Sequence, residues 1–387
     1  MSRFLRLAAF LFSFCILAGV TYFPASADTS EALALSAHSA VLIDADSGSV
    51  LYAKNANERL PMASTTKIMT AYVALALAKP EHVIRTDAGA VGIEGSSIYL
   101  NEGEELTLEQ LLYALLLESA NDAAAAIAIG LSGSVEAFAD EMNRKAQSLG
   151  LTNTHFTNPH GLHDEDHYTT ARELALLSHA ALQNELIQTI VSTRKTTIPH
   201  AGSDGVRLLV NHNKMLRLYD GCIGVKTGFT KQSGRCLVSA AERDGVRLIA
   251  VTIDAPNDWS DHTAMLDYGF ARYHSVKLCD MAFLYPLPLV NAKEDYVMLG
   301  VEEDACVTLP NEVGEIQQVI ECRRFESAPV FQGEVCGRML FYCDSDGDGV
   351  RECIAEVPMI ACYSVETKAD TRTFWQKILD WWASLFL

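Results

Sequence analysis

Hydrophobic and polar positions alternate in two parts of the chain, and between them lie stretches in which apolar residues recur at helical spacing. The first alternating part, residues 39–55, is interrupted by Asp46-Ser47-Gly48 and predicts a β-hairpin. The second part, residues 222–254, contains turn residues at 231–234. Strands, then helices, then strands predict an α+β fold, in which helices pack against an antiparallel sheet.

The helical stretches carry residues that typically start or stop a helix. Proline removes a backbone donor, a capping box satisfies free N–H groups, and a glycine closes a helix in the left-handed conformation. The predicted boundaries are a start near Ser64 and an end before Pro80, a capping box of Thr107 with Gln110, and a helix opened by Ser134 and closed by Gly150. A helix over 262–274 is expected to end this domain, which would span residues 28–274.

The last third of the chain changes character. Residues 275–370 have the pattern of short strands separated by Pro, Gly and Asn, which predicts a small all-β domain. Residues 371–387 place their large apolar side chains, including Trp375, Trp381 and Trp382, on one face of a helical wheel. This amphipathic helix is too short to span a bilayer and is expected to lie in the membrane interface. The alternative is a terminal helix docked on its own domain.

The first residues are typical of an export signal. Arg3 and Arg6 precede an apolar stretch, and Ala25-Ser26-Ala27 gives a small-residue cleavage site. We therefore expect residues 1–27 to be removed and the mature protein to lie outside the cytoplasm. An uncleaved membrane anchor is the alternative.

The net charge and the cysteine content limit the possible partners and the possible covalent cross-links of this protein. The formal net charge of −19, without a basic cluster, argues against nucleic acid as a partner. The chain has ten cysteines, which in an exported protein permit disulfides but equally suit reduced core residues. Cys343 and Cys353 are equidistant from a predicted turn and are expected to face each other at disulfide range.

The segment from Asp344 begins like a calcium loop. Asp344, Asp346 and Asp348 have the spacing of calcium ligands, but Ala355 stands where a bidentate glutamate is needed. An acidic hairpin turn is therefore favoured over a calcium site, and no cofactor or metal is expected.

Ser64 and Lys67 are the first candidates for catalysis. A spacing of three places both side chains on one face of a helical turn. Serine is a weak nucleophile unless a base takes its proton, and lysine can be that base only if burial or another cation lowers its pKa. Alone, this pair also suits a helix cap beside a surface lysine.

Two further motifs favour the catalytic interpretation of Ser64 and Lys67 over the helix cap. Ser119-Ala120-Asn121 lies at the end of a predicted helix, and Lys226-Thr227-Gly228 lies on a predicted strand. S-x-x-K, S-D-N and K-T-G occur together in penicillin-binding proteins and class A β-lactamases. Here they occur in that order, with Ala120 in place of the middle Asp. Over residues 35–274 the chain resembles the low-molecular-mass penicillin-binding proteins, the serine-type D-alanyl-D-alanine carboxypeptidases, and it therefore suggests a transpeptidase-like catalytic domain.

The resemblance implies a role for each matching residue. Ser64 would attack the penultimate D-Ala carbonyl of a peptidoglycan stem peptide, or a β-lactam, and Lys67 would accept its proton. Ser119 would pass the proton to the leaving amine while Lys226 keeps the region electropositive. The remaining candidates are Asn121, which would hold Lys67 and the substrate amide, Thr227, which would bind the terminal carboxylate, Phe229, whose N–H would join that of Ser64 in an oxyanion hole, and Gly228, over which substrate would pass.

Some neighbours are open to two interpretations. His160 matches a position near the site in the family, but equally suits a loop histidine that holds backbone. Glu173 stands where the family often has an acidic residue, and a charge at a helix N-terminus is its favoured role. Some members hold the substrate carboxylate with an arginine before the final helix, and this chain has none there.

The first functional hypothesis is an exported D,D-carboxypeptidase that trims peptidoglycan pentapeptides at the outer face of the cytoplasmic membrane. A D,D-endopeptidase and a β-lactamase are alternatives on the same scaffold. The β-lactamase would need a glutamate that positions water, for which Glu165 and Glu173 are the candidates in sequence. A catalytically inactive wall-binding protein is the alternative of a different class.

Overall fold

The computed structural model describes residues 33–200, 205–344, 349–368 and 374–383, so the predicted signal segment lies outside the described residues. Contacts divide the chain into two compact units, one of Met1–Ala240 with Ile249–Met265 and one of Ala241–Leu248 with Leu266–Leu387. Each unit has its own hydrophobic core, as expected for a chain of this length.

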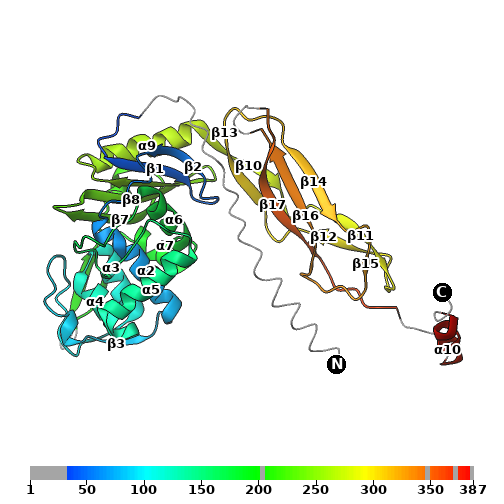
Figure 1. The fold of residues 1–387 in the computed structure, drawn as a ribbon, viewed down its shortest axis with the longest axis horizontal. Coiled ribbons are helices and arrows are strands. Elements are labelled where there is room, and N and C mark those ends of the chain that lie inside the picture. The colour runs from blue at the N-terminus through cyan, green and yellow to red at the C-terminus, as the bar shows by residue number, and fades with distance from the viewer. Residues whose placement is uncertain (1–32, 201–204, 345–348, 369–373, 384–387) are drawn as a thin grey trace. The chain divides into compact units, whose positions relative to one another are not determined.

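A five-stranded sheet with the order β2-β1-β9-β8-β7 organises the first unit. Its strands are β1 (Ser39–Asp44), β2 (Val50–Lys54), β7 (Cys222–Thr230), β8 (Gly234–Arg243) and β9 (Val246–Ile253). Helix α9 (Asp258–Arg272) covers one face, and the other helices of this unit lie on the opposite side (Figure 1). The α+β prediction is confirmed, and β7 is an edge strand with one side free for other contacts.

The remaining helices form the body on the other side of this sheet. They are η1 (Ala63–Thr66), α2 (Lys67–Leu77), η2 (Ala88–Ala90), α3 (Leu108–Leu117), α4 (Asn121–Ser132), α5 (Val135–Ser148), α6 (Ala171–Ala181), α7 (Glu185–Ser192) and α8 (Met215–Leu218). The capping box of Thr107 with Gln110 is present, and Ser134 caps α5. Helix α9 runs from Asp258 to Arg272, where the prediction was 262–274, and the Asp258 carboxylate accepts from the Trp259 N–H at 3.0 Å in its first turn.

The centre of this body is α4, in which every residue from Asn121 to Ala128 is buried. Its run of alanines allows close packing, since small side chains let neighbouring helices approach. Helices α2, α3 and α5 all contact it. The N-terminus of α4 is therefore held rigidly next to the start of α2.

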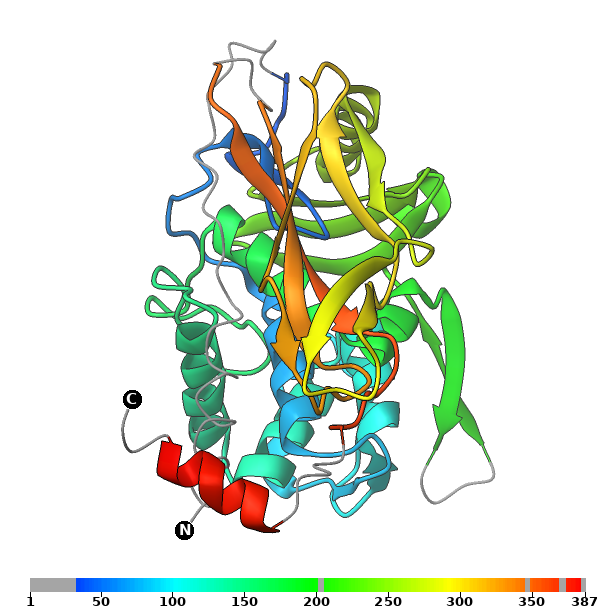
Figure 2. The ribbon, with the colours of Figure 1, turned by 90° about the vertical axis from the view of Figure 1, so that its right-hand side faces the viewer.

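Two short two-stranded sheets complete the unit. They are β3 (Val83–Arg85) with β4 (Glu105–Thr107), and β5 (Lys195–Pro199) with β6 (Val206–Val210). Figure 2 shows β5 and β6, in green, extending away from the body. Near the loop end of β5 and β6, a buried ion pair joins Arg207 to Glu104, and Arg207 also donates to the Tyr99 carbonyl at 3.2 Å. These contacts fasten the hairpin to the loop that precedes α3.

The second unit is built of strands, which confirms the predicted all-β domain. Strands β10 (Tyr273–Cys279) and β13 (Ala305–Pro310) pair as a two-stranded sheet. A six-stranded sheet has the order β14-β16-β17-β12-β11-β15. Its strands are β11 (Tyr285–Val290), β12 (Tyr296–Gly300), β14 (Gln317–Cys322), β15 (Glu326–Ser327), β16 (Val335–Cys343) and β17 (Glu352–Ala361).

The expected facing of Cys343 and Cys353 is wrong. A register shift after Phe341 makes Cys353 the partner of Tyr342, while Cys343 lies opposite Glu352. Side chains alternate between the faces of a strand, so this slip of one residue puts the two thiols on different faces. All cysteines of the described residues are free. The hairpin itself is confirmed, whereas Asp346 and Asp348 of the calcium-like segment lie outside the described residues.

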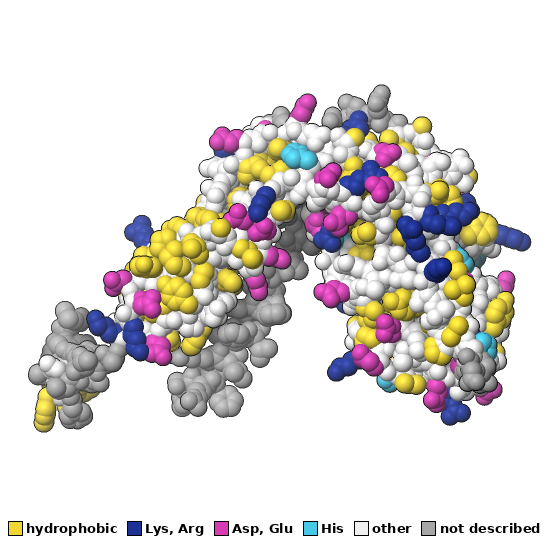
Figure 3. All heavy atoms as spheres, turned by 180° about the vertical axis from the view of Figure 1, so that it is seen from behind, with side chains coloured by type: hydrophobic (Ala, Val, Ile, Leu, Met, Phe, Trp, Pro, Cys, Tyr) yellow, Lys and Arg dark blue, Asp and Glu magenta, His cyan; other side chains and the backbone are white. Residues whose placement is uncertain are grey.

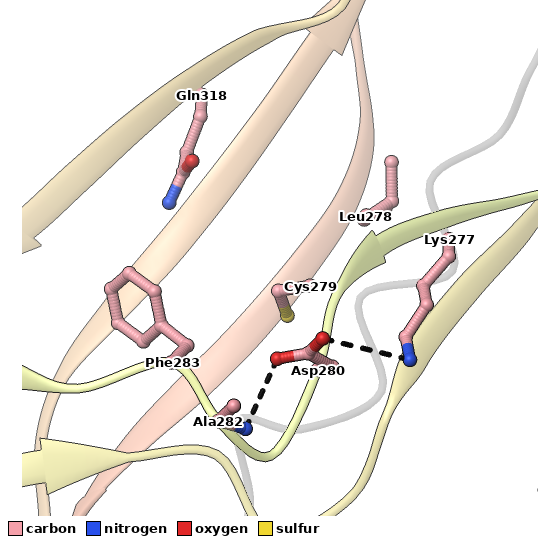
Figure 4. Close-up of a pocket in the computed structure, with 7 residues that line it drawn as sticks. All are labelled: Lys277, Leu278, Cys279, Asp280, Ala282, Phe283 and Gln318. Carbon is pink, nitrogen blue, oxygen red and sulfur yellow. Dashed lines mark hydrogen bonds and ion pairs between the residues drawn. The ribbon is translucent and has the colours of Figure 1, made fainter.

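The second unit also carries a shallow pocket of about 380 Å³ (Figure 4). Its polar lining comes from Lys277, Cys279, Asp280 and Gln318, and the Lys277 ammonium lies 2.7 Å from a carboxylate oxygen of Asp304. None of the residues predicted for catalysis lines it. On the face drawn in Figure 3, acidic side chains lie among the basic ones on both units.

The last described element is α10 (Phe374–Ala383), where Trp375, Trp381 and Trp382 are exposed. Within the described residues no single helix is long and apolar enough to cross a bilayer. Helices α4 and α5 would reach that length only together, and they are bent by 85° at their break.

Candidate active site

Ser64 lies in η1, the short turn that leads into α2. Ala63, directly before it, has a φ of +49°, in the left-handed region that a residue with a side chain rarely adopts. The Thr65 and Thr66 hydroxyls donate to the carbonyls of Met62 and Ala63, which closes the turn on itself. Ser64 is not a helix cap, because the cap of η1 is Met62. The turn instead places its side chain beside Lys67.

Lys67 is the first residue of α2 and is completely buried. Its Nζ lies 3.0 Å from Ser64 Oγ, 2.7 Å from Asn121 Oδ1 and 2.6 Å from the His160 carbonyl oxygen. The amide and carbonyl oxygens can only accept, whereas a hydroxyl can also donate. When Lys67 is neutral, its two N–H groups therefore satisfy Asn121 and His160, and its lone pair faces the Ser64 hydroxyl.

The surroundings of Lys67 favour this neutral form. Burial lowers the pKa of Lys67 well below its usual value, and the positive charge of Lys226 lowers it further. The Asp122 carboxylate acts in the opposite direction, but does not outweigh burial. Burial and the neighbouring Lys226 are therefore the desolvation and the second cation that a lysine base requires.

Lys226 comes from the edge strand β7 and is also buried. Burial lowers the pKa of Lys226 to about 7, and its Nζ donates to the Thr227 carbonyl at 3.0 Å. The last residue of the motif, Gly228, lies close to Ser64: a Cβ placed there would be 3.1 Å from the Ser64 backbone nitrogen. Strand β7 therefore passes Ser64 at a distance that only glycine allows without displacement.

Ser119 and Asn121 bracket the junction between α3 and α4. Ser119 has a φ of +60° and is buried, and Asn121 is the first residue of α4. Asn121 accepts from Lys67 through its oxygen and donates through its nitrogen to the Glu94 carbonyl at 2.5 Å. Its side chain is thus held from both ends and links Lys67 to the loop before α3.

Both interpretations of His160 apply, to different atoms. The backbone oxygen of His160 accepts from Lys67, while its ring Nδ1 accepts from the Leu162 N–H at 3.2 Å. Burial, followed by the charge of Lys67, lowers the pKa of His160 to about 3, so the ring is neutral at physiological pH. The ring holds its loop, and the carbonyl belongs to the site.

Three neighbours of the site escaped the sequence analysis. The Asp122 carboxylate accepts from Ser97 Oγ at 2.6 Å and Leu100 N at 3.0 Å, which fixes the loop before α3. Gly161 packs on the Ala63 carbonyl, and His167 contacts the Thr66 hydroxyl. Asp122 directly follows Asn121, so its place in the sequence could have indicated its role. Gly161 and His167 could not be found in this way, because they act through contacts between distant parts of the chain.

Neither candidate glutamate is placed as a water-positioning base. Glu165 is exposed. Both oxygens of Glu173 accept from the Asn153 N–H, and one also accepts from Thr154 Oγ1 at 2.5 Å. Glu173 therefore holds the loop in front of α6, which adds a structural role to the expected charge at a helix start.

Comparison with known proteins gives one consistent result. Residues 26–257 match the family described as D-alanyl-D-alanine carboxypeptidase. The chain is 34% identical to D-alanyl-D-alanine carboxypeptidase DacF of Bacillus subtilis over 92% of both chains, and 30% identical to DacC of Escherichia coli over 98% of this chain and 96% of the other. It also resembles the crystal structure of penicillin binding protein 5 from Haemophilus influenzae, with a TM-score of 0.67 and 28% identity, covering 86% of this chain and 98% of that one.

Gly161 gives a direct test of this geometry. A Cβ at Gly161 would lie 2.0 Å from the Ala63 carbonyl oxygen, so Gly161→Ala must displace the turn that carries Ser64. We expect it to lower the free energy of unfolding by more than about 3 kcal/mol, measured by denaturant titration.

Gly133→Ala is the matched control. Gly133 has a similar φ of +83°, but a Cβ there meets no atom within 4 Å. Only the backbone strain remains, which costs about 1 to 2 kcal/mol. Equal losses in the two variants would mean that Gly161 and Ala63 are not in the close contact described.

Proposed function

This chain belongs to the D-alanyl-D-alanine carboxypeptidase family, and we propose that it performs the reaction with Ser64 as nucleophile and Lys67 as base. The family makes it a serine-type carboxypeptidase, a hydrolase that acts on peptidoglycan and binds β-lactams. The observation that carries the residue roles is the contact set of Lys67, in which two obligate acceptors leave the lone pair of the neutral amine for Ser64.

Acylation then follows from the positions of these groups. Ser64 Oγ attacks the carbonyl carbon of the penultimate D-Ala as its proton passes to Lys67 Nζ. The negative charge on the carbonyl oxygen is stabilised by the N–H groups of Ser64 and Phe229, and the close passage of Gly228 beside Ser64 supports this pairing. The tetrahedral intermediate collapses when the C–N bond to the terminal D-Ala breaks.

The leaving amine needs a proton, and Ser119 is the proposed relay. Its hydroxyl gives a proton to the departing D-Ala nitrogen and regains one from Lys67, with Lys226 keeping the region electropositive. Thr227 and Lys226 bind the terminal carboxylate. Water then attacks the ester carbonyl, and the proton it loses returns through Lys67 to Ser64 Oγ as the shortened peptide leaves.

The alternatives are less well supported. A β-lactamase needs a base for rapid deacylation, and neither Glu165 nor Glu173 is placed for it. An inactive scaffold would not need a buried lysine pair beside a serine, since burying charge is costly. Whether the site acts as a carboxypeptidase or as an endopeptidase depends on which peptides reach Ser64.

The proposed nucleophile can be tested with a β-lactam and a peptide substrate. The protein from Asp28 to Asp370 should form a stable adduct of one equivalent with a fluorescent penicillin, and it should release D-Ala from a pentapeptide. Intact-mass measurement and a D-Ala assay check both.

Ser64→Ala should lose the adduct and the release while keeping the thermal unfolding temperature. An adduct that turns over in seconds without D-Ala release would instead indicate a β-lactamase. Absence of an adduct in the unmodified protein would support the inactive scaffold.

The pH dependence of acylation tests the coupling between Lys67 and Lys226. The positive charge of Lys226 helps to hold the pKa of Lys67 down. Lys226→Gln removes that charge, which favours the protonated amine and raises the pKa of Lys67. Because only the neutral amine accepts a proton, the rising limb of the acylation rate against pH should move to higher pH.

Lys195→Gln is the matched control, because Lys195 is exposed on the β5–β6 hairpin. It should leave the limb in place. A limb that stays fixed in Lys226→Gln, or moves to lower pH, would contradict the proposed coupling of the two lysines.

We also propose that the protein works outside the cytoplasm and attaches to the membrane surface through residues 371–387. Exposed Trp375, Trp381 and Trp382 in α10 support this, because tryptophan favours the bilayer interface. The Asp28–Leu387 protein should float with lipid vesicles in a density gradient, while Asp28–Asp370 should stay in the aqueous fractions.

Trp375→Ser together with Trp381→Ser should reduce flotation without changing D-Ala release. Equal flotation of the long and short proteins would refute the proposed anchor.

A further inference from the structure

We propose that His167 is a positioning residue for Ser64, acting through the hydroxyl of Thr66. The inference rests on the proposed function, because it concerns the turn that presents the nucleophile. His167 is nearly completely buried, lies about a hundred residues along the chain from Ser64, and belongs to none of the three motifs. Its ring nevertheless contacts the turn that carries Ser64.

The hydrogen bonds of the ring determine which nitrogen carries the proton. Nδ1 lies 3.0 Å from the Thr157 backbone nitrogen, an obligate donor, so Nδ1 must accept. In the neutral ring the proton is then on Nε2, which lies 2.7 Å from Thr66 Oγ1. Burial is the main reason that the pKa of His167 is lowered to about 4, so the neutral form is the one present at physiological pH.

The proton on Nε2 in turn orients the Thr66 hydroxyl. A hydroxyl has a single hydrogen, and when its oxygen accepts from Nε2 that hydrogen remains for another acceptor. The acceptor is the Ala63 carbonyl at 2.8 Å. The chain of bonds therefore runs from Thr157 through His167 and Thr66 to Ala63, with every donor and acceptor matched.

This chain of bonds ends on a residue with an unfavourable backbone conformation. Ala63 has its φ of +49° directly before Ser64, a conformation that persists only where surrounding contacts impose it. The bond to its carbonyl is one of those contacts, and the packing of Gly161 on the same oxygen is another. Without the Thr66 bond, Ala63 is free to relax and to carry the Ser64 side chain away from Lys67.

The same ring also holds the loop that completes the site. Thr157 belongs to the segment that supplies the His160 carbonyl to Lys67, and Thr70 of α2 donates to the Pro159 carbonyl at 2.6 Å. The Phe156 ring packs edge-on against His167, at a centroid distance of 5.7 Å. His167 thus couples the nucleophile turn to the loop that binds the base.

An ordinary core histidine is the competing explanation, and His262 provides the comparison. His262 is also completely buried, with its ring nitrogens 2.5 Å from Ser239 Oγ and 3.0 Å from Thr252 Oγ1. Those partners lie on β8 and β9, away from the turn of Ser64. A purely structural histidine should behave like His262, so His262→Gln is the matched control.

The test uses variants that retain different ends of the imidazole. His167→Gln places an amide nitrogen near the position of Nε2 and can still donate to Thr66. His167→Asn places an oxygen near the position of Nδ1 and can accept from Thr157 but not reach Thr66. Thr66→Val removes the hydroxyl and keeps the shape. The measurements are the rate of acylation by fluorescent penicillin, kcat and KM for D-Ala release, and the unfolding temperature.

We expect His167→Asn and Thr66→Val to acylate roughly 10-fold to 100-fold more slowly, since misplacement of a nucleophile by about 1 Å has effects of this size. The loss should fall on kcat, with KM changed by less than about 3-fold, because the substrate contacts are untouched. His167→Gln should retain most of the rate. His262→Gln should lower the unfolding temperature without slowing acylation.

Combining the two changes gives a further check. Because His167 and Thr66 belong to one chain of bonds, the double variant His167→Asn with Thr66→Val should be no slower than the slower single variant. Multiplying losses would mean that the two residues act separately, and would overturn the inference.

Acylation at the unmodified rate in His167→Asn and Thr66→Val would also overturn it, as would rates that follow the unfolding temperature across all variants, including His262→Gln. These outcomes are distinct from a failure of the proposed function, in which the unmodified protein would show no adduct at Ser64.

Discussion

The buried amine of Lys67 is the constraint on which the rest of the site depends. A lysine removed from water must give up its proton or find acceptors for all three N–H groups. Here the surroundings supply two obligate acceptors, Asn121 and His160, and one hydroxyl that can reverse its role. The neutral amine of the proposed base therefore faces Ser64, and the positive charge of Lys226 adds to burial in lowering the pKa of Lys67.

Holding these groups together requires parts of the backbone in unfavourable conformations. Ala63 and Ser119 both have positive φ, next to the nucleophile and at the proposed proton relay respectively. Such strain is maintained by well-packed surroundings. The alanine-rich α4, buried among α2, α3 and α5, provides the rigid frame, and glycines at 161 and 228 allow the loop and β7 to approach the turn of Ser64.

The hydrogen bonds of His167 connect the turn of Ser64 to a loop later in the chain. The loop that precedes α6 supplies an acceptor to Lys67, and the turn that precedes α2 carries Ser64. The loop and the turn must therefore keep a fixed position relative to each other. A single neutral imidazole, bonded to Thr157 on the loop and to Thr66 on the turn, links them. Low pKa values at His160 and His167 have the same cause, burial, and keep both rings neutral beside the lysines.

Local sequence determined much of this protein. Alternation predicted the β1–β2 hairpin and the strand pair β7–β8, and the capping residues Thr107 and Ser134 were found where expected. Motif order predicted a site of Ser64, Lys67, Ser119, Asn121 and Lys226, of which the structure brings Ser64, Lys67 and Asn121 into hydrogen-bond contact. These features depend on residues close in sequence or on a recognised pattern of side chains. Tertiary structure alone decided the rest. The register shift that separates Cys343 from Cys353, the carbonyl that His160 offers to Lys67, and the bond between His167 and Thr66 each depend on how distant segments pack, and packing leaves no periodic signal in the residues that it brings together.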